Sequence, residues 1–259
     1  MATHHHINIK KTGTIAGVTL VLTYLAMNNP LLSGHIAGAL IGGILPALFW
    51  LWFWLKEDKV HPEPKKIIFE AFYLGMIAVI IAIFLEKLTY DSILQYSPLL
   101  FFIWAVIEET LKYFAAFIAG IRTKYFDEPI DVVMYMISSA LGFSALENVL
   151  FIYNSLNTAD MTTIPLRFIG ASLLHVACSA LIGFGIGFGV GKSKIVRIFY
   201  LFTGLSFSFA LHTIFNYSIM EAGQKYLFNI FLLLWVVIVC ILILFEKIKQ
   251  SPYYISNVN

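Results

Sequence analysis

Charged residues are scarce in this 259-residue sequence. Asp, Glu, Lys and Arg make up 12% of it, about half of the roughly 25% that is usual in soluble domains. Apolar residues make up 59% and the mean hydropathy is +0.83. One buried core cannot contain so many apolar residues. The composition therefore excludes an ordinary soluble enzyme and predicts a surface that faces lipid. The formal net charge of +2 gives no reason to expect a nucleic-acid partner.

Cysteines and long polar segments are also scarce. The two cysteines, Cys178 and Cys240, lie inside apolar runs, so we expect buried thiols. The longest clear polar connection runs only from Lys56 to Lys66. No inserted soluble domain is therefore expected, and residues 1–259 are predicted to form a single transmembrane domain.

Long apolar runs dominate the chain. A helix that crosses a membrane needs about 17–25 mostly apolar residues, and eight segments meet or approach that length. The first run resembles a signal peptide but ends at Asn28 without a small-x-small cleavage site, so we expect a retained helix after a tail of residues 1–12. His4–His6 resemble a tag remnant and are set aside. We predict an all-α, polytopic membrane protein with helices at 13–27, 35–55, 67–88, 98–120, 131–153, 166–190, 197–217 and 226–246.

The positive residues predict the orientation in the membrane. Of the 17 Lys and Arg residues, 13 lie on the N-terminal tail or in every second connection after it. The opposite side holds Lys87, Arg167 and Lys225, and Lys112 lies inside helix 98–120. Because cytoplasmic connections carry the excess of Lys and Arg, we expect both termini in the cytoplasm and an even number of helices.

Several polar side chains stand inside the predicted membrane helices, where a charged group costs at least about 2.5–3.5 kcal/mol. With a rise of about 1.5 Å per residue, they all lie in the outer half of the membrane, roughly 8–16 Å from the outer helix ends. Scattered structural residues have no reason to share a depth. The sequence therefore predicts one site between the fourth and seventh helices, formed by Glu108, Glu109, Lys112, Glu147, His175, His212 and Asn216.

These residue types suit the hydrolysis of a peptide bond. The reaction needs an activated water, a general base and a group that stabilises the oxyanion. Two His and one Glu can hold Zn²⁺ and leave its fourth position for water. We therefore predict Glu147, His175 and His212 as zinc ligands.

The remaining site residues are expected to act on the water and the substrate. Glu108 and Glu109 are adjacent on a helix and point about 100° apart, so only one of them is expected to face the centre as the base. Lys112 neutralises the other carboxylate, and Asn216 donates to the oxyanion or supports His212. The Lys112 ammonium also leaves open a mechanism without metal, in which glutamate and histidine activate water directly.

Each of these residues has a structural interpretation as well. The Glu-Lys pair of helix 98–120 suits a buried ion pair, and a single His in a membrane helix is often a packing residue. The shared depth favours the site over these interpretations. Outside the site, we expect Glu70 and Glu86 at the membrane interface, and Asp58 and Glu63 in a solvated loop.

Two other classes of function stay open beside the protease. A proton-coupled transporter would use the buried carboxylates and histidines as a relay, but it would show inverted repeats, and the sequence has no internal repeat. A non-catalytic membrane scaffold or immunity protein would tolerate the loss of Glu109 or His175. The Glu-Glu-x-x-Lys spacing suits a catalytic cluster better than a relay.

Four motifs together carry a family resemblance. They are Glu108-Glu109-x-x-Lys112, Phe143-Ser-Ala-Leu-Glu147-Asn148, His175 in a mid-chain helix, and His212-x-x-x-Asn216. With the loop Asp58-Lys-Val-His-Pro-Glu63-Pro64, they resemble the PrsW family of intramembrane proteases. That family is distantly similar to the CAAX prenyl endopeptidases and bacteriocin-immunity proteins. In that larger group His stands where this sequence has Glu147 and Arg where it has Lys112, which favours PrsW.

The resemblance covers roughly Asp58 to Asn216 and carries functional expectations. It implies site-1 cleavage of a membrane-anchored anti-sigma factor on its extracytoplasmic side, in the cytoplasmic membrane of a prokaryote. The partners implied are a membrane-protein substrate and the lipid bilayer. Whether the family uses a metal or a glutamate-histidine water mechanism stays open at this stage.

Overall fold

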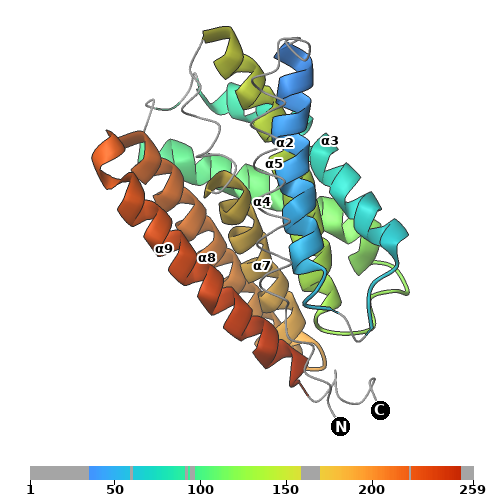
Figure 1. Ribbon diagram of the computed structural model, residues 1–259. Helices are drawn as coiled ribbons and strands as arrows, with labels where there is room; N and C mark the ends of the chain where they lie inside the picture. Colours follow the sequence, from blue (N-terminus) through green and yellow to red (C-terminus); the bar gives the residue numbers. More distant parts are fainter. Residues whose placement is uncertain are drawn as a thin grey trace.

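The computed structural model describes residues 35–58, 61–90, 93, 97–158, 170–221 and 223–251. Over these residues the protein is all-helical, as predicted (Figure 1). The predicted helix at 13–27 lies outside the described residues, and the other seven predicted helices are present. They are α2 (His35–Trp54), α3 (Lys65–Tyr90), α4 (Pro98–Ala116) with the π-turn η2 (Phe117–Ile121), α5 (Asp131–Thr158), α7 (Ser172–Gly189), α8 (Lys194–Glu221) and α9 (Gly223–Lys249).

Six of these helices are long and apolar enough to cross a membrane. The other, α4, carries three charged site residues and has a well-defined start. Ser97 caps it, since its Oγ accepts a hydrogen bond from Leu100 N at 3.2 Å, and Pro98 takes the first helical position. This start fixes where Glu108 and Glu109 lie along α4. The side of the membrane on which each connection lies stays a prediction.

Helix α5 forms the centre of the bundle. It packs against α2, α3 and α7, and α7 in turn packs against α8. Figure 1 shows α8 and α9 side by side along one edge, with α2 and α3 toward the other. Nearly every side chain of α5 from Asp131 to Ala145 is buried. By contrast, α8 and α9 expose large apolar side chains such as Phe202 and Val236, as expected of surfaces that face lipid.

Two glycines allow α3 and α5 to pack backbone against backbone. A Cβ at Gly142 would lie 1.8 Å from Phe72 O, and one at Gly75 would lie 2.0 Å from Ser139 O. A side chain at either position would push the helices apart. The close crossing places Glu86 on α3 and Glu147 on α5 near the same interior space.

Two expectations about polar and thiol side chains are wrong. Asp58 is only 2% exposed and Glu63 is half-buried, because the α2–α3 connection folds back against the start of α5, where Tyr135 donates a hydrogen bond to Glu63. Cys178 is buried as predicted, but Cys240 is exposed, because it lies on the outer face of α9.

Candidate active site

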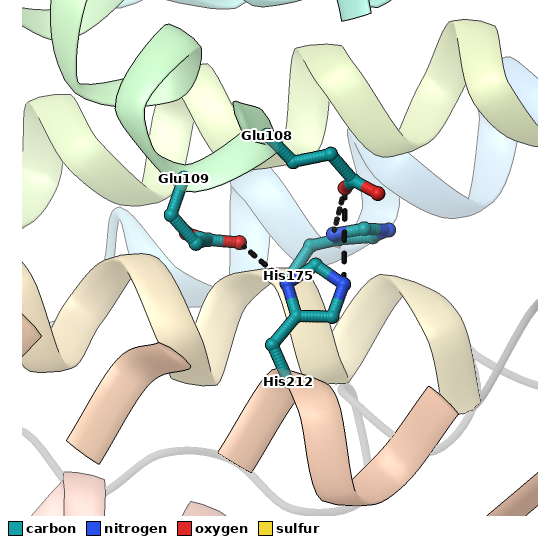
Figure 2. Close-up of side chains that lie close together, drawn as sticks. All are labelled: Glu108, Glu109, His175 and His212. Carbon is teal, nitrogen blue, oxygen red and sulfur yellow. Dashed lines mark hydrogen bonds and ion pairs between the residues drawn. The ribbon is translucent and has the colours of Figure 1, made fainter. Parts of the chain in front are cut away.

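Four side chains from three helices converge inside the bundle (Figure 2). Glu108 and Glu109 come from α4, His175 from α7 and His212 from α8. None is more than 5% exposed. One potential ligand atom from each lies within 4.8 Å of the others. The structure thus brings four of the predicted site residues to one point.

The Lys112 ammonium lies within this cluster and is fully buried. Its Nζ donates to Glu108 Oε2 at 3.0 Å and to Glu109 Oε1 at 2.7 Å. It also lies 2.7 Å from His175 Nδ1. An ammonium group has three donors, so all three are used within the site. Lys112 therefore contacts both carboxylates, whereas the sequence suggested that it would neutralise one.

These contacts assign the tautomer of His175. Because an ammonium cannot accept a hydrogen bond, Nδ1 of a neutral His175 ring accepts from Lys112 and its proton is on Nε2. Nε2 lies 3.1 Å from Glu147 Oε2 and donates to it. Glu147 therefore contacts the ring on the side away from Lys112. A carboxylate in this position orients a histidine ring and raises the basicity of its other nitrogen.

Glu109 is held more tightly than any other carboxylate of the site. Its Oε1 accepts from Lys112 and from His212 Nδ1 at 3.0 Å, and its Oε2 accepts from Ser179 Oγ at 2.7 Å. Ser179 was not predicted as a site residue. Its position four residues after His175, on the same face of α7, could have pointed to it.

His212 has one nitrogen in use and one without a partner. Since Nδ1 donates to Glu109, the neutral ring carries a lone pair on Nε2. Nε2 is buried and has no hydrogen-bond partner among the described residues. It lies 3.8 Å from Glu108 Oε2, so this lone pair is available to a proton, a water or a metal ion.

A cavity of about 280 Å³ opens beside the cluster. Glu108, Glu147, His175 and Asn216 line it together with Glu86. Glu109 does not line it, so Glu108 is the carboxylate of the pair that faces the space where a substrate can enter. Both carboxylates join the cluster, so the expectation that only one of them faces the centre is wrong; only Glu108 lines the cavity.

Glu86 was expected at the membrane interface, and the structure places it in the cavity instead. Its neighbours there include Trp104 and Phe101, so the polar groups of the cavity face aromatic walls. Glu86 is distant from the other site residues in the sequence, so its place in the same cavity could not be predicted.

Only two of the three metal ligands predicted from the sequence lie close together. His175 and His212 lie close together, with ring centroids 5.3 Å apart. The four-residue group that could hold an ion contains Glu108 and Glu109 with these two rings, and Glu147 lies outside it, on His175 Nε2. Two ligand atoms at about 2.1 Å from zinc with tetrahedral angles lie about 3.4 Å apart. Glu108 Oε2 lies 3.7 Å from His175 Nδ1 and 3.8 Å from His212 Nε2, which is near that spacing.

Comparisons with known proteins point to one family. A family model described as "PrsW family intramembrane metalloprotease" matches residues 63–244. Protease PrsW of Geobacillus kaustophilus is 28% identical over 220 residues, covering 82% of this chain and 91% of the relative. Protease PrsW of Bacillus subtilis is 31% identical over 154 residues, covering 59% and 67%. No solved structure matches the chain.

The matched region runs from the α2–α3 connection into α9 and includes all seven predicted site residues. The relatives are named as proteases and come from bacteria, which favours hydrolysis over the transporter and scaffold hypotheses. The chain therefore belongs to the PrsW family of intramembrane proteases.

Proposed function

We propose that this protease hydrolyses a peptide bond of a membrane-anchored protein at the cavity beside Glu108. The observation that carries the proposal is the buried cluster of Glu108, Glu109, His175 and His212, which opens to a cavity through only one of its two adjacent carboxylates. A pure ion-pair network has no need of such an opening.

Glu108 is the general base in this proposal. A water beside its carboxylate gives up a proton to Glu108 as its oxygen adds to the scissile carbonyl carbon. The C–N bond then breaks, and the proton held by Glu108 passes to the leaving amine. The side-chain amide of Asn216, on the same cavity wall, donates a hydrogen bond to the oxyanion.

The other residues position this base. Lys112 offsets the two negative charges and fixes Glu108 through Oε2. Glu109, anchored by Ser179, fixes the His212 ring. Glu147 fixes the His175 ring from the cavity side. Loss of either histidine therefore disturbs the base even where the ring itself does not take the proton.

The family description implies a metal ion, and zinc fits the donor atoms of the site. Glu108, His175 Nδ1 and His212 Nε2 would hold it, with Glu147 and Glu109 on the outer nitrogens of the two rings as orienting carboxylates. In that case Glu108 would serve as a ligand in place of its role as the base. Bound there, zinc would polarise the substrate carbonyl and lower the pKa of water. The ligand set with Glu147 in place of Glu108 stays a prediction. Lys112 also contacts His175 Nδ1, so zinc and the ammonium would compete for that nitrogen.

The substrate side of the proposal rests on the charge distribution and on the family resemblance. The site lies in the outer half of the predicted topology, so cleavage is expected near the extracytoplasmic end of the substrate's membrane segment. The resemblance names an anti-sigma factor as the substrate, and the outer position of the site agrees with site-1 cleavage.

A cell-based cleavage assay tests the proposal. A membrane-anchored anti-sigma factor with a tag on each side of its membrane segment would be co-expressed with the wild type, Glu108→Gln or His175→Ala. We expect the wild type to shorten the tagged protein and both variants to leave it intact at equal expression. Shortening at the wild-type rate by both variants would contradict the assignment of this site. If the anti-sigma factor stays intact while other membrane-anchored proteins are cleaved, only the identity of the substrate is contradicted.

A further inference from the structure

A second group of acids lies at the first turn of α5, away from the candidate active site. Asp58 follows α2, Glu63 lies in the α2–α3 connection, and Asp131 begins α5. One carboxylate oxygen from each lies within 4.8 Å of the others. In Figure 1 the α2–α3 and α4–α5 connections lie at the same end of the bundle, which is where this group forms.

The group is buried and has unused acceptors. Asp58 is 2% exposed and Asp131 is 1% exposed. Asp131 Oδ2 accepts from the backbone N–H groups of Asp127 at 2.9 Å and Glu128 at 2.6 Å. The other oxygen, Oδ1, has no hydrogen-bond partner among the described residues, and neither has Asp58 Oδ1. Buried acceptors in native proteins are almost always satisfied, so these two oxygens point to a missing ligand.

Within the described part of the chain, no Lys, Arg or His forms an ion pair with these three carboxylates. Carboxylate oxygens of Glu63 and Asp131 lie within 4.8 Å of each other, and two carboxylates that close need a proton or a cation between them. Lys249 is close enough to influence Asp58, but its Nζ donates to Glu57 at 2.8 Å and Glu246 at 2.9 Å. Burial raises the pKa of Asp58 to about 7 and also raises that of Glu63, as expected of acids without a counterion.

We propose that Asp58, Glu63 and Asp131 bind one hard divalent cation, Ca²⁺ or Mg²⁺, at a site separate from the protease centre. Only oxygen atoms are offered, and these two ions prefer oxygen ligands. Ligands on opposite sides of Ca²⁺ lie about 4.6–5.2 Å apart, so the observed spread within 4.8 Å fits a single ion. The Tyr135 hydroxyl donates to Glu63 and orients it.

The ion would fasten the α2–α3 connection to the start of α5. That helix carries Glu147, which contacts His175, and it packs closely against α3, which carries Glu86. The bound cation therefore stabilises the two helices that form one wall of the cavity without touching the reacting groups.

Equilibrium binding on the purified full-length chain tests this site. The protein would be stripped with a chelator and dialysed, then titrated with CaCl₂ or MgCl₂ alone, with the bound ion counted per chain and the Tm measured. We expect about one ion per chain and a higher Tm at saturation. Asp58→Asn should weaken binding at least about tenfold, and Asp131→Asn should do the same.

Two controls separate this site from other acids. Glu70→Gln removes the same charge from α3 outside the group, and His212→Ala alters the protease centre, so both should bind the ion as the wild type does. Because Asp131 also accepts from the backbone N–H groups of Asp127 and Glu128, its replacement can disturb folding. If Asp131→Asn does not fold, Asp58→Asn alone tests the site. Absence of binding by the wild type would overturn the proposal in favour of a shared proton. Wild-type binding by Asp58→Asn would overturn it by showing that the ion binds elsewhere. Neither result bears on the cleavage assay.

Discussion

Replacing Glu108 by Gln removes a negative charge but keeps the shape of the side chain and one oxygen acceptor. Lys112 Nζ donates to Glu108 at 3.0 Å, and the amide oxygen of Gln can still accept that bond. An amide can neither take a proton from water nor hold zinc as a carboxylate does. We therefore expect the cleavage rate to fall by about 10²–10⁴-fold, the usual contribution of a general base.

Glu109→Gln should behave differently, because Glu109 is fully buried and accepts from Lys112, His212 and Ser179. Its loss leaves the Lys112 charge less compensated, and breaking a buried ion pair costs about 3–5 kcal/mol. The cost of Glu108→Gln should stay within about 1–3 kcal/mol. Both variants would be purified, and substrate cleavage and Tm measured beside Glu70→Gln, a same-type change on α3 that should alter neither.

The reasoning fails if Glu108→Gln cleaves at a rate close to that of the wild type while keeping its Tm. The prediction about stability is contradicted separately if Glu109→Gln is no less stable than Glu108→Gln. The extra hydrogen bonds to Glu109 would then have no energetic effect.

Four further outcomes are expected. Asn216→Ala should slow cleavage about 10–100-fold, less than the loss of Glu108, because it removes one oxyanion donor, and kcat measures this. Without divalent cations, stability should fall as the pH rises from about 4 to 7, because the folded protein holds a proton on Asp58 in that window; thermal melts of Asp58→Asn should show a weaker slope. Gly142→Ala should lower the Tm, since its Cβ would lie 1.8 Å from Phe72 O. Reporter fusions after Lys194 should read cytoplasmic and fusions at Thr158 external, and an external signal at Lys194 would contradict the topology.

The sequence was sufficient to predict the seven described helices and which of their polar side chains come together. Apolar runs of membrane-spanning length have few structural alternatives, which explains the seven predicted helices that are present. Polar residues in such runs are costly, so the shared depth of Glu108, Glu147, His175 and His212 was an informative signal.

The rotation of each helix could not be predicted, and this decides which contacts each residue makes. Helix α5 is buried on nearly all sides, so the sequence does not show that Glu147 would contact the outer nitrogen of His175. For the same reason, the sequence does not show that Glu86 would line the cavity. Asp58 and Glu63 were misjudged because a short polar connection ordinarily faces solvent, and only its packing against Tyr135 and Asp131 shows otherwise.

Mapping the cleavage products of a reconstituted substrate tests the central claim most directly. A purified membrane-anchored protein would be incubated with the wild type, Glu108→Gln or His175→Ala in the same lipid, and the new termini identified by mass spectrometry. We predict one pair of new termini near the extracytoplasmic end of the membrane segment, formed by the wild type and by neither variant. The same termini at comparable rates from both variants would contradict the account, because the peptide bond would then be broken elsewhere than at this cluster.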